Sequence, residues 1–196
     1  MVPGYTILGL IGKGGMGVVY RARQENLDRI VALKTVLVGQ MGDPNMVSRF
    51  EQEAMTVARF RHPNIVTAYD FGRHEGRLYF VMEMVECQNV EELILQRGRL
   101  DETTVLRLSR QVASGLSHAA NAGIVHRDIK PSNILLVEPP EGLSHSDGLP
   151  MVKIADFGLA FLTSVPETRT RLTADNQILG SPHYMAPEQI SGEQVD

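Results

Sequence analysis

Two short polar motifs contain side chains that could move a phosphoryl group between oxygen atoms. The first motif is His126-Arg127-Asp128-Ile129-Lys130-Pro131-Ser132-Asn133, and the second is Asp156-Phe157-Gly158. Phosphoryl transfer requires from a protein mainly positioning and charge neutralisation. Asp128 could accept a hydroxyl proton, and Lys130 could steady the transferring group. Asn133 and Asp156 offer the hard oxygen ligands that Mg²⁺ prefers. A polar loop with buried, hydrogen-bonded acids is the alternative, and it does not explain this order of residue types.

A glycine-rich segment near the N-terminus could hold the phosphates of a nucleotide. Its residues are Gly12, Lys13, Gly14, Gly15, Met16, Gly17, Val18 and Val19. Glycines allow backbone N–H groups to close over phosphates without Cβ clashes. In a dinucleotide-binding fold such a loop opens a helix, whereas residues 18–23 predict a strand here. The pattern therefore predicts a hairpin that covers the phosphates of a nucleotide. A glycine-rich turn between two strands, with no ligand, is the alternative.

A lysine in the third expected strand could reach the same phosphates. In the run Val31-Ala32-Leu33-Lys34, Ala32 and Lys34 face one side, so the small residue could cover an adenine while the lysine extends beyond it. The helix expected at 44–60 places Glu53 on its apolar stripe, where an acid needs a cation. We expect Lys34 to be that cation. A surface lysine and a solvated Glu53 are the alternatives.

The elements that must position these residues form a β-rich first part and a more helical second part. Strands are expected at 5–11, 18–23, 30–36, 65–69 and 78–84, with a polar turn containing Gly72 and Gly76 between the last two. Helices are expected at 44–60, capped by Asp43, at 90–97, closed by Gly98, and at 103–122, capped by Asp101. Two further strands are expected at 134–137 and 151–155, joined by an exposed loop at 138–150.

Composition and charge exclude several other classes of protein. The 196 residues are 43% hydrophobic and 21% charged, and the formal net charge of -4 argues against a bulk nucleic-acid binder. The one cysteine, Cys87, excludes a disulfide within the chain and favours a reducing, cytoplasmic setting, with Cys87 as a half-buried apolar residue. No stretch is long and apolar enough to cross a bilayer. A membrane anchor of the parent protein would lie outside this sequence.

In their order along the chain, these motifs resemble those of serine/threonine protein kinases, and in particular the bacterial kinases related to eukaryotic ones. The resemblance covers residues 5–196 and includes Ala186-Pro187-Glu188. Lys130 is typical of serine/threonine rather than tyrosine kinases. The resemblance implies an α+β, bilobal fold, with a kinase N-lobe at 1–84 (a five-stranded sheet and a regulatory helix) and a partial, helical C-lobe at 85–196. It also implies ATP with Mg²⁺ or Mn²⁺, and protein substrates that carry Ser or Thr.

The resemblance assigns further roles position by position. Glu83 and Val85 would offer backbone groups to the adenine edge, and Met82 would guard the pocket behind it. The residues that would enclose the adenine ring are Val19, Ala32 and Leu135, and Glu53 would be the helix glutamate that pairs with Lys34. Arg127 would pair with a phosphate on the activation segment. The candidate self-phosphorylation sites are Thr168, Thr170 and Thr173, and Ser181 would belong to the substrate-docking loop.

The sequence departs from the family's pattern in two places. The loop 138–150 is longer than usual, which costs little closure entropy. The chain ends at Asp196, where the family fold continues with further helices, so we expect a fragment of a longer kinase. We also expect the apolar stripe of the 103–122 helix, formed by Leu108, Val112, Leu116 and Ala119, to lose much of its cover. Because every catalytic position is filled, an enzyme is expected. A truncated module that binds nucleotide or a partner without turnover, and a small-molecule kinase of similar fold, are the alternatives.

Overall fold

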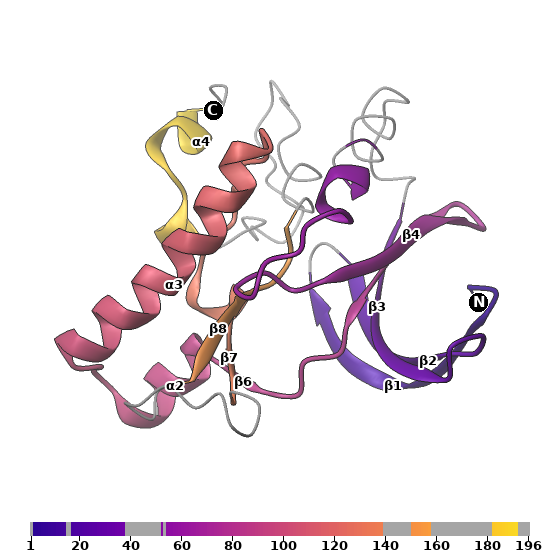
Figure 1. Ribbon diagram of the computed structural model, residues 1–196, viewed down its shortest axis with the longest axis horizontal. Coiled ribbons are helices and arrows are strands. Elements are labelled where there is room, and N and C mark those ends of the chain that lie inside the picture. Colours follow the sequence, from indigo (N-terminus) through magenta and orange to yellow (C-terminus); the bar gives the residue numbers. More distant parts are fainter. Residues whose placement is uncertain are drawn as a thin grey trace, which may run out of the picture.

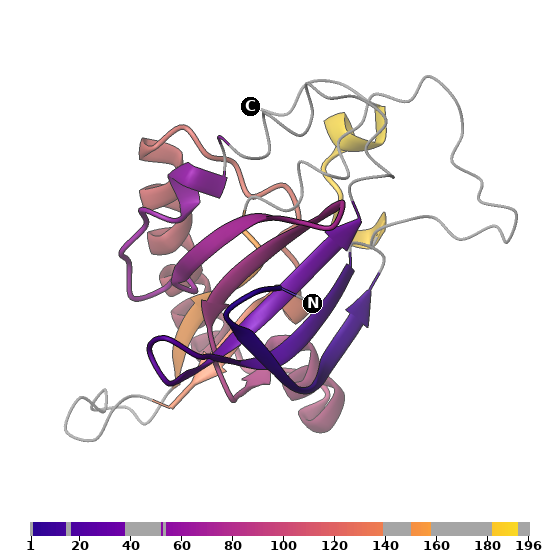
Figure 2. The same ribbon diagram turned by 90° about the vertical axis from the view of Figure 1, so that its right-hand side faces the viewer.

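The computed structural model describes residues 2–14, 17–37, 52, 54–138, 150–157 and 182–191. A five-stranded antiparallel sheet forms one side of the molecule, and helices α2 and α3 form the other, with a small three-stranded sheet between them (Figure 1). The view turned by 90° shows the strands of the large sheet side by side and strongly twisted (Figure 2). The expected α+β class with a β-rich first part is confirmed.

The large sheet follows the order β1-β2-β3-β5-β4. Its strands are β1 (Tyr5–Gly14), β2 (Gly17–Gln24), β3 (Arg29–Leu37), β4 (Ala68–His74) and β5 (Arg77–Glu83). Side chains of β3 alternate between two apolar clusters, because successive residues of a strand point to opposite faces. Val31 and Leu33 lie in the smaller cluster, whereas Ala32 and Val36 lie in the main core. Lys34 therefore faces the main core with Ala32, as the sequence predicts.

The fourth strand lies further along the chain than expected. It begins at Ala68 rather than at residue 65, and Gly72 lies inside it instead of in the turn. The turn is formed by Glu75 and Gly76, whose φ angles of 48° and 70° suit a tight hairpin. Gly72 is needed within the strand because its cross-strand partner Tyr79 covers it, and a Cβ there would lie 2.6 Å from the Tyr79 hydroxyl.

The segment after the first expected helix joins the sheet of the other lobe. Gln52 and residues 54–57 are helical, and the expected cap at Asp43 lies outside the described residues. The chain then turns, and residues 64–66 run parallel to β8 (Met151–Ile154). The Ile154 N–H donates to the Asn64 carbonyl, and the Val66 N–H donates to the Ile154 carbonyl, both at 2.9 Å. Residues 64–66 thus form an extra edge on the small sheet.

The expected helices and caps of the second part are confirmed. α2 (Val90–Arg97) starts at a capping box between Asn89 and Glu92 and ends at Gly98, whose φ is 75°. α3 (Glu102–Asn121) is capped by Asp101, whose carboxylate accepts from the Thr104 N–H at 2.9 Å. The small sheet comprises β6 (Gln88–Asn89), β7 (Ile134–Val137) and β8. Near the end of the described chain lie η4 (Pro182–Tyr184) and α4 (Pro187–Ser191).

The apolar stripe of α3 is covered, which corrects the expectation of lost cover. Leu108, Val112 and Ala119 are buried, and Leu116 is half-buried against the same core. Gly115 makes this packing possible: a Cβ at that position would lie 2.9 Å from Cδ1 of Ile154 and 3.1 Å from the carbonyl oxygen of Asn64. β8 and the 64–66 segment therefore pack directly on the α3 backbone. No helix in the described part of the chain is long and apolar enough to span a membrane.

Candidate active site

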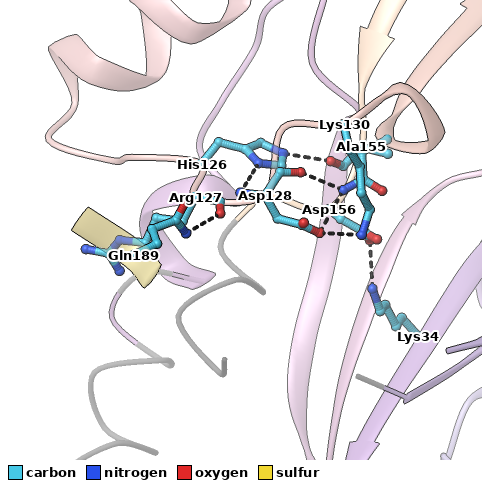
Figure 3. Close-up of polar contacts among 9 residues, drawn as sticks. Lys34, His126, Arg127, Asp128, Lys130, Ala155, Asp156 and Gln189 are labelled. Carbon is cyan, nitrogen blue, oxygen red and sulfur yellow. Dashed lines mark hydrogen bonds and ion pairs between the residues drawn. The ribbon is translucent and has the colours of Figure 1, made fainter. Parts of the chain in front are cut away.

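Three side chains of the first polar motif form one hydrogen-bonded group around Asp128. The Lys130 ammonium lies 2.9 Å from Oδ2 of Asp128 (Figure 3). Nδ2 of Asn133 donates to the same oxygen at 3.0 Å and to the Asp128 backbone carbonyl at 2.8 Å. The short 3-10 turn η2 (Pro131–Asn133) brings Asn133 back towards Asp128. The Asn133 N–H closes this turn by donating to the Lys130 carbonyl at 2.9 Å. The expected grouping of these three residues is present.

A second group joins Lys34 on β3 to Asp156 at the end of β8. The Lys34 ammonium lies 2.9 Å from Oδ1 of Asp156, and the side chains are 6% and 30% exposed (Figure 3). A buried ammonium needs an anion beside it, and the structure places Asp156 in that role. The sequence-based partner, Glu53, lies outside the described residues. Asp156 lies two residues after the last residue of β8, and a carboxylate so close to the end of a buried strand was a signal that could have suggested this partner.

Backbone contacts fix the two groups relative to each other. The Ala155 N–H donates to the Asn133 carbonyl at 2.9 Å. His126 contacts the Ala155 carbonyl through Nε2 at 2.9 Å and accepts from the Asp128 N–H at Nδ1, at 3.3 Å. The neutral tautomer protonated at Nε2 satisfies both contacts. Burial lowers the pKa of His126 and thus favours this neutral form. Its ring packs edge-on against Phe157, with centroids 4.5 Å apart.

The glycine-rich segment forms the predicted hairpin rather than the start of a helix. β1 pairs with β2 up to Gly14 and Gly17, with Gly12 opposite Val19 and Lys13 opposite Val18. Gly17 has a φ of 145°, and a Cβ there would lie 2.1 Å from the carbonyl oxygen of Thr35, so only glycine fits. Gly15 and Met16, the expected tip of the loop, lie outside the described residues. The dinucleotide-binding alternative, which needs a helix at this point, is excluded.

The residues expected to surround an adenine belong to one apolar cluster. Ala32 and Met82 are buried, and Val19, Val85 and Leu135 are half-buried against the same core. Met82 lines a small pocket beside Asp156 and Phe157, which suits its expected place behind the nucleotide. Cys87 is half-buried, as expected; its thiol donates to the Val85 carbonyl at 3.8 Å, and burial raises its pKa.

The side chain of Glu83 has a role that the sequence did not indicate. Its Oε1 lies 2.7 Å from the Lys153 ammonium and accepts from the Thr67 N–H at 2.7 Å. The Glu83 N–H in turn donates to the Thr67 carbonyl at 2.9 Å. Glu83 ends β5 and Lys153 lies in β8, so this ion pair connects the two sheets three residues before Asp156.

Gln189 in α4 contacts the backbone of the first polar motif. The Gln189 amide donates from Nε2 to the Arg127 carbonyl at 2.8 Å and accepts from the Ala186 N–H at Oε1, at 3.0 Å (Figure 3). Sequence reasoning named Gln189 only as the residue that follows Ala186-Pro187-Glu188 in the family's motif and gave it no contact, because no local pattern relates it to Arg127. The candidate phosphorylation sites, Thr168, Thr170 and Thr173, and the docking-loop residue Ser181 lie outside the described residues.

Comparison with known proteins places these motifs in one family. Residues 5–196 match the protein kinase domain family. The chain is 42% identical over 193 residues to the serine/threonine-protein kinase pkn3 of Myxococcus xanthus and 40% identical over 188 residues to the serine/threonine-protein kinase PrkC of Bacillus subtilis. These matches cover 98% and 96% of this chain but only 34% and 27% of the relatives, so the chain spans about a third or less of their length.

Solved structures agree with the sequence comparison. The kinase domain of Mycobacterium tuberculosis PknI superimposes with a TM-score of 0.73 at 26% identity, over 99% of this chain and 66% of that one. A double mutant of the same domain gives a TM-score of 0.74 at 26% identity, over 100% and 67%. With the glycine hairpin, the Lys34–Asp156 pair and the Asp128 group in one fold of this shape, the chain belongs to the protein kinase domain family.

Proposed function

We propose that the chain is the catalytic part of an ATP-dependent protein serine/threonine kinase. The observation that carries the proposal is an assembly of two polar groups, one around Asp128 with Lys130 and Asn133 and one formed by Lys34 and Asp156. The hydrogen bond from the Ala155 N–H to the Asn133 carbonyl joins the two groups in this assembly. The assembly contains an acid that can accept a proton, two ammonium groups for phosphate oxygens, and oxygen ligands for a divalent cation. Phosphoryl transfer needs these parts within reach of one another.

Asp128 is proposed as the residue that accepts the substrate hydroxyl proton. Its Oδ2 takes contacts from Lys130 and Asn133. No hydrogen bond or ion pair among the described residues uses Oδ1 of Asp128, so this oxygen can face an incoming hydroxyl. Lys130 would then lie beside the transferring group, where its positive charge favours the developing negative charge. Lys34 is proposed to hold the phosphates of ATP through its ammonium group.

Asn133 and Asp156 are proposed as the ligands of a divalent cation. Nδ2 of Asn133 donates twice to Asp128, which leaves Oδ1 as the atom that can face a cation. Asp156 uses Oδ1 for Lys34 and offers Oδ2. The residues therefore fit such an ion, and a bound ion would neutralise charge on the phosphates. No group of three or more His, Cys, Asp and Glu ligands exists among the described residues. Two protein oxygens completed by phosphates and water suit Mg²⁺, with Mn²⁺ as a substitute.

The finer assignments extend the same proposal. The hairpin residues Gly12–Gly17 would cover the phosphates, and Glu83 and Val85 would contact the adenine edge through their backbones. Val19, Ala32 and Leu135 would enclose the ring, and Glu53 would support Lys34. Protein Ser and Thr hydroxyls are the proposed acceptors, including Thr168, Thr170 or Thr173 of the kinase itself. The N-lobe is proposed at 1–84 and the C-lobe at 85–196, in a cytoplasmic setting without nucleic acid as a partner.

Intact-mass analysis after incubation with MgATP and a generic basic protein tests this proposal. The wild-type chain should add phosphate to Ser or Thr, and Asp128→Asn should abolish the transfer while calorimetry shows MgATP binding within about threefold of wild type. Asp101→Asn is the matched control, because Asn caps a helix as well as Asp does and position 101 lies at the start of α3. Wild-type turnover by Asp128→Asn would refute the role of that carboxylate. MgATP binding without transfer by the wild-type chain would favour the non-catalytic module.

A further inference from the structure

The peptide bond that precedes Asp128 is held at both of its polar ends. Its N–H, on Asp128, donates to Nδ1 of His126 at 3.3 Å. Its carbonyl, on Arg127, accepts from Nε2 of Gln189 at 2.8 Å (Figure 3). A peptide group is planar, so two contacts at opposite ends fix the rotation of the plane. That rotation sets the direction in which the Asp128 side chain leaves the backbone.

The backbone at this point needs such support. Arg127 has a φ of 64°, in the left-handed region that costs a residue with a Cβ about 1–2 kcal/mol. Such a conformation persists only where surrounding contacts enforce it, and it concentrates at functional sites. On the other side of Asp128, its own carbonyl is held by Asn133 at 2.8 Å. Gln189 therefore supplies the contact on the Arg127 carbonyl, from a segment remote in sequence.

We propose that Gln189 is a positioning residue for Asp128, which acts through the Arg127 carbonyl; this inference rests on the proposed kinase function. Gln189 suits the task because one amide group supplies a donor and an acceptor at fixed separation. Its Oε1 accepts from the Ala186 N–H at 3.0 Å, which holds the amide so that Nε2 faces Arg127. The Gln189 and Ile190 N–H groups donate back to the Ala186 carbonyl at 3.0 and 3.2 Å. Ala186 and Gln189 thus form one closed unit at the start of α4.

Two substitutions separate the two halves of the Gln189 amide. Gln189→Glu keeps an acceptor for the Ala186 N–H, but at neutral pH it has no donor and places a carboxylate against the Arg127 carbonyl. Gln189→Leu has a similar size and loses both contacts. Ser191→Ala is the matched control on the same helix, because the Ser191 hydroxyl donates only to the Pro187 carbonyl, at 3.0 Å. For each protein, kcat and the KM for ATP are measured with a generic basic protein as acceptor, together with the melting temperature.

The expected result is a loss in kcat that follows the Arg127 contact. Both Gln189 variants should lose about tenfold in kcat, which corresponds to one hydrogen bond of about 1.4 kcal/mol, at a KM for ATP within about twofold of wild type. Gln189→Glu should lose at least as much as Gln189→Leu. Ser191→Ala should match the wild type. This split between kcat and KM is expected of a residue that orients Asp128 and does not touch the nucleotide.

Several outcomes would overturn the inference. Near-wild-type kcat in Gln189→Glu, with a loss only in Gln189→Leu, would assign the effect to the Ala186 contact. A fall in melting temperature with an unchanged kcat per folded molecule would show a purely structural role. If wild type and Ser191→Ala transfer phosphate and both Gln189 variants match them, the inference alone fails. If no protein in the set transfers phosphate, the proposed function fails, and the role of Gln189 fails with it.

Discussion

The ion pair between Glu83 and Lys153 should be a measurable source of stability between the two sheets. The two charged groups lie 2.7 Å apart, and the side chains of Lys153 and Glu83 are 13% and 20% exposed. Removing one partner of a fully buried pair costs about 3–5 kcal/mol, whereas exposed pairs contribute about 0–1 kcal/mol. Because both side chains keep some exposure, we expect a cost between these two ranges, so that Lys153→Met lowers the free energy of unfolding by about 2 kcal/mol.

A double-mutant cycle isolates the contribution of the pair. Glu83→Gln removes the charge but keeps an oxygen that can accept from the Thr67 N–H, which Glu83 now does at 2.7 Å. Glu83→Gln, Lys153→Met and the double variant are unfolded in urea and followed by far-UV circular dichroism, since the chain has no tryptophan. Each single variant leaves one charge without its partner, so the double variant should be more stable than the sum predicts, by about 1–2 kcal/mol.

The refuting result is additivity. If the two single effects add within about 0.3–0.5 kcal/mol, the pair contributes no coupling, and the reasoning from distance and burial is wrong. If the m-value, the slope of the free energy of unfolding against urea concentration, also changes, the coupling would instead indicate an altered unfolded state or a loss of two-state behaviour.

Three further predictions concern the nucleotide, pH and packing. Lys34→Met should lower kcat/KM for ATP by at least about tenfold, because the buried ammonium is lost. Steady-state kinetics with varied ATP measure this ratio, and an unchanged value would contradict the prediction. Burial lowers the pKa values of His126 and His62 in the folded state. The free energy of unfolding should therefore be highest above pH 6.5, about the pKa of a histidine in the unfolded chain, and should decrease as the pH falls below that value. Equal urea midpoints at about pH 8 and about pH 5.5 would disprove this. Gly115→Ala should cost about 1–3 kcal/mol, seen as a lower melting temperature, whereas the control Gly9→Ala, where a Cβ meets nothing within 4 Å, should not.

Features that depend on local rules were predictable from the sequence. Asp101 caps α3 and Gly98 ends α2, because a side-chain acceptor and a residue with positive φ are needed at those two positions. The alternation that turns Ala32 and Lys34 to one side also follows from the strand period alone. Asp128 and Asn133 were expected to act together, since one short loop carries both of them.

Features that depend on contacts between remote segments were not predictable in the same way. The sequence placed Gly72 in a turn, because nothing local shows that Tyr79 will lie across it. The contact between Gln189 and Arg127 spans 62 residues, and that between Lys153 and Glu83 spans 70. Such pairs arise only when segments remote in sequence pack together, and neither residue of a pair belongs to a pattern that points to the other.

The short run at 64–66 has a consequence for the inheritance of kinase segments. Because it adds an edge to the small sheet at Ile154 and lies against α3 near Gly115, the first part of the chain carries a piece that the second part must accommodate. A recombinant that takes residues 1–84 from a different kinase brings its own version of this run to a foreign β8. Substitutions at Asn64, Ile65, Gly115 and Ile154 should therefore be inherited together, and recombination that separates them should be selected against.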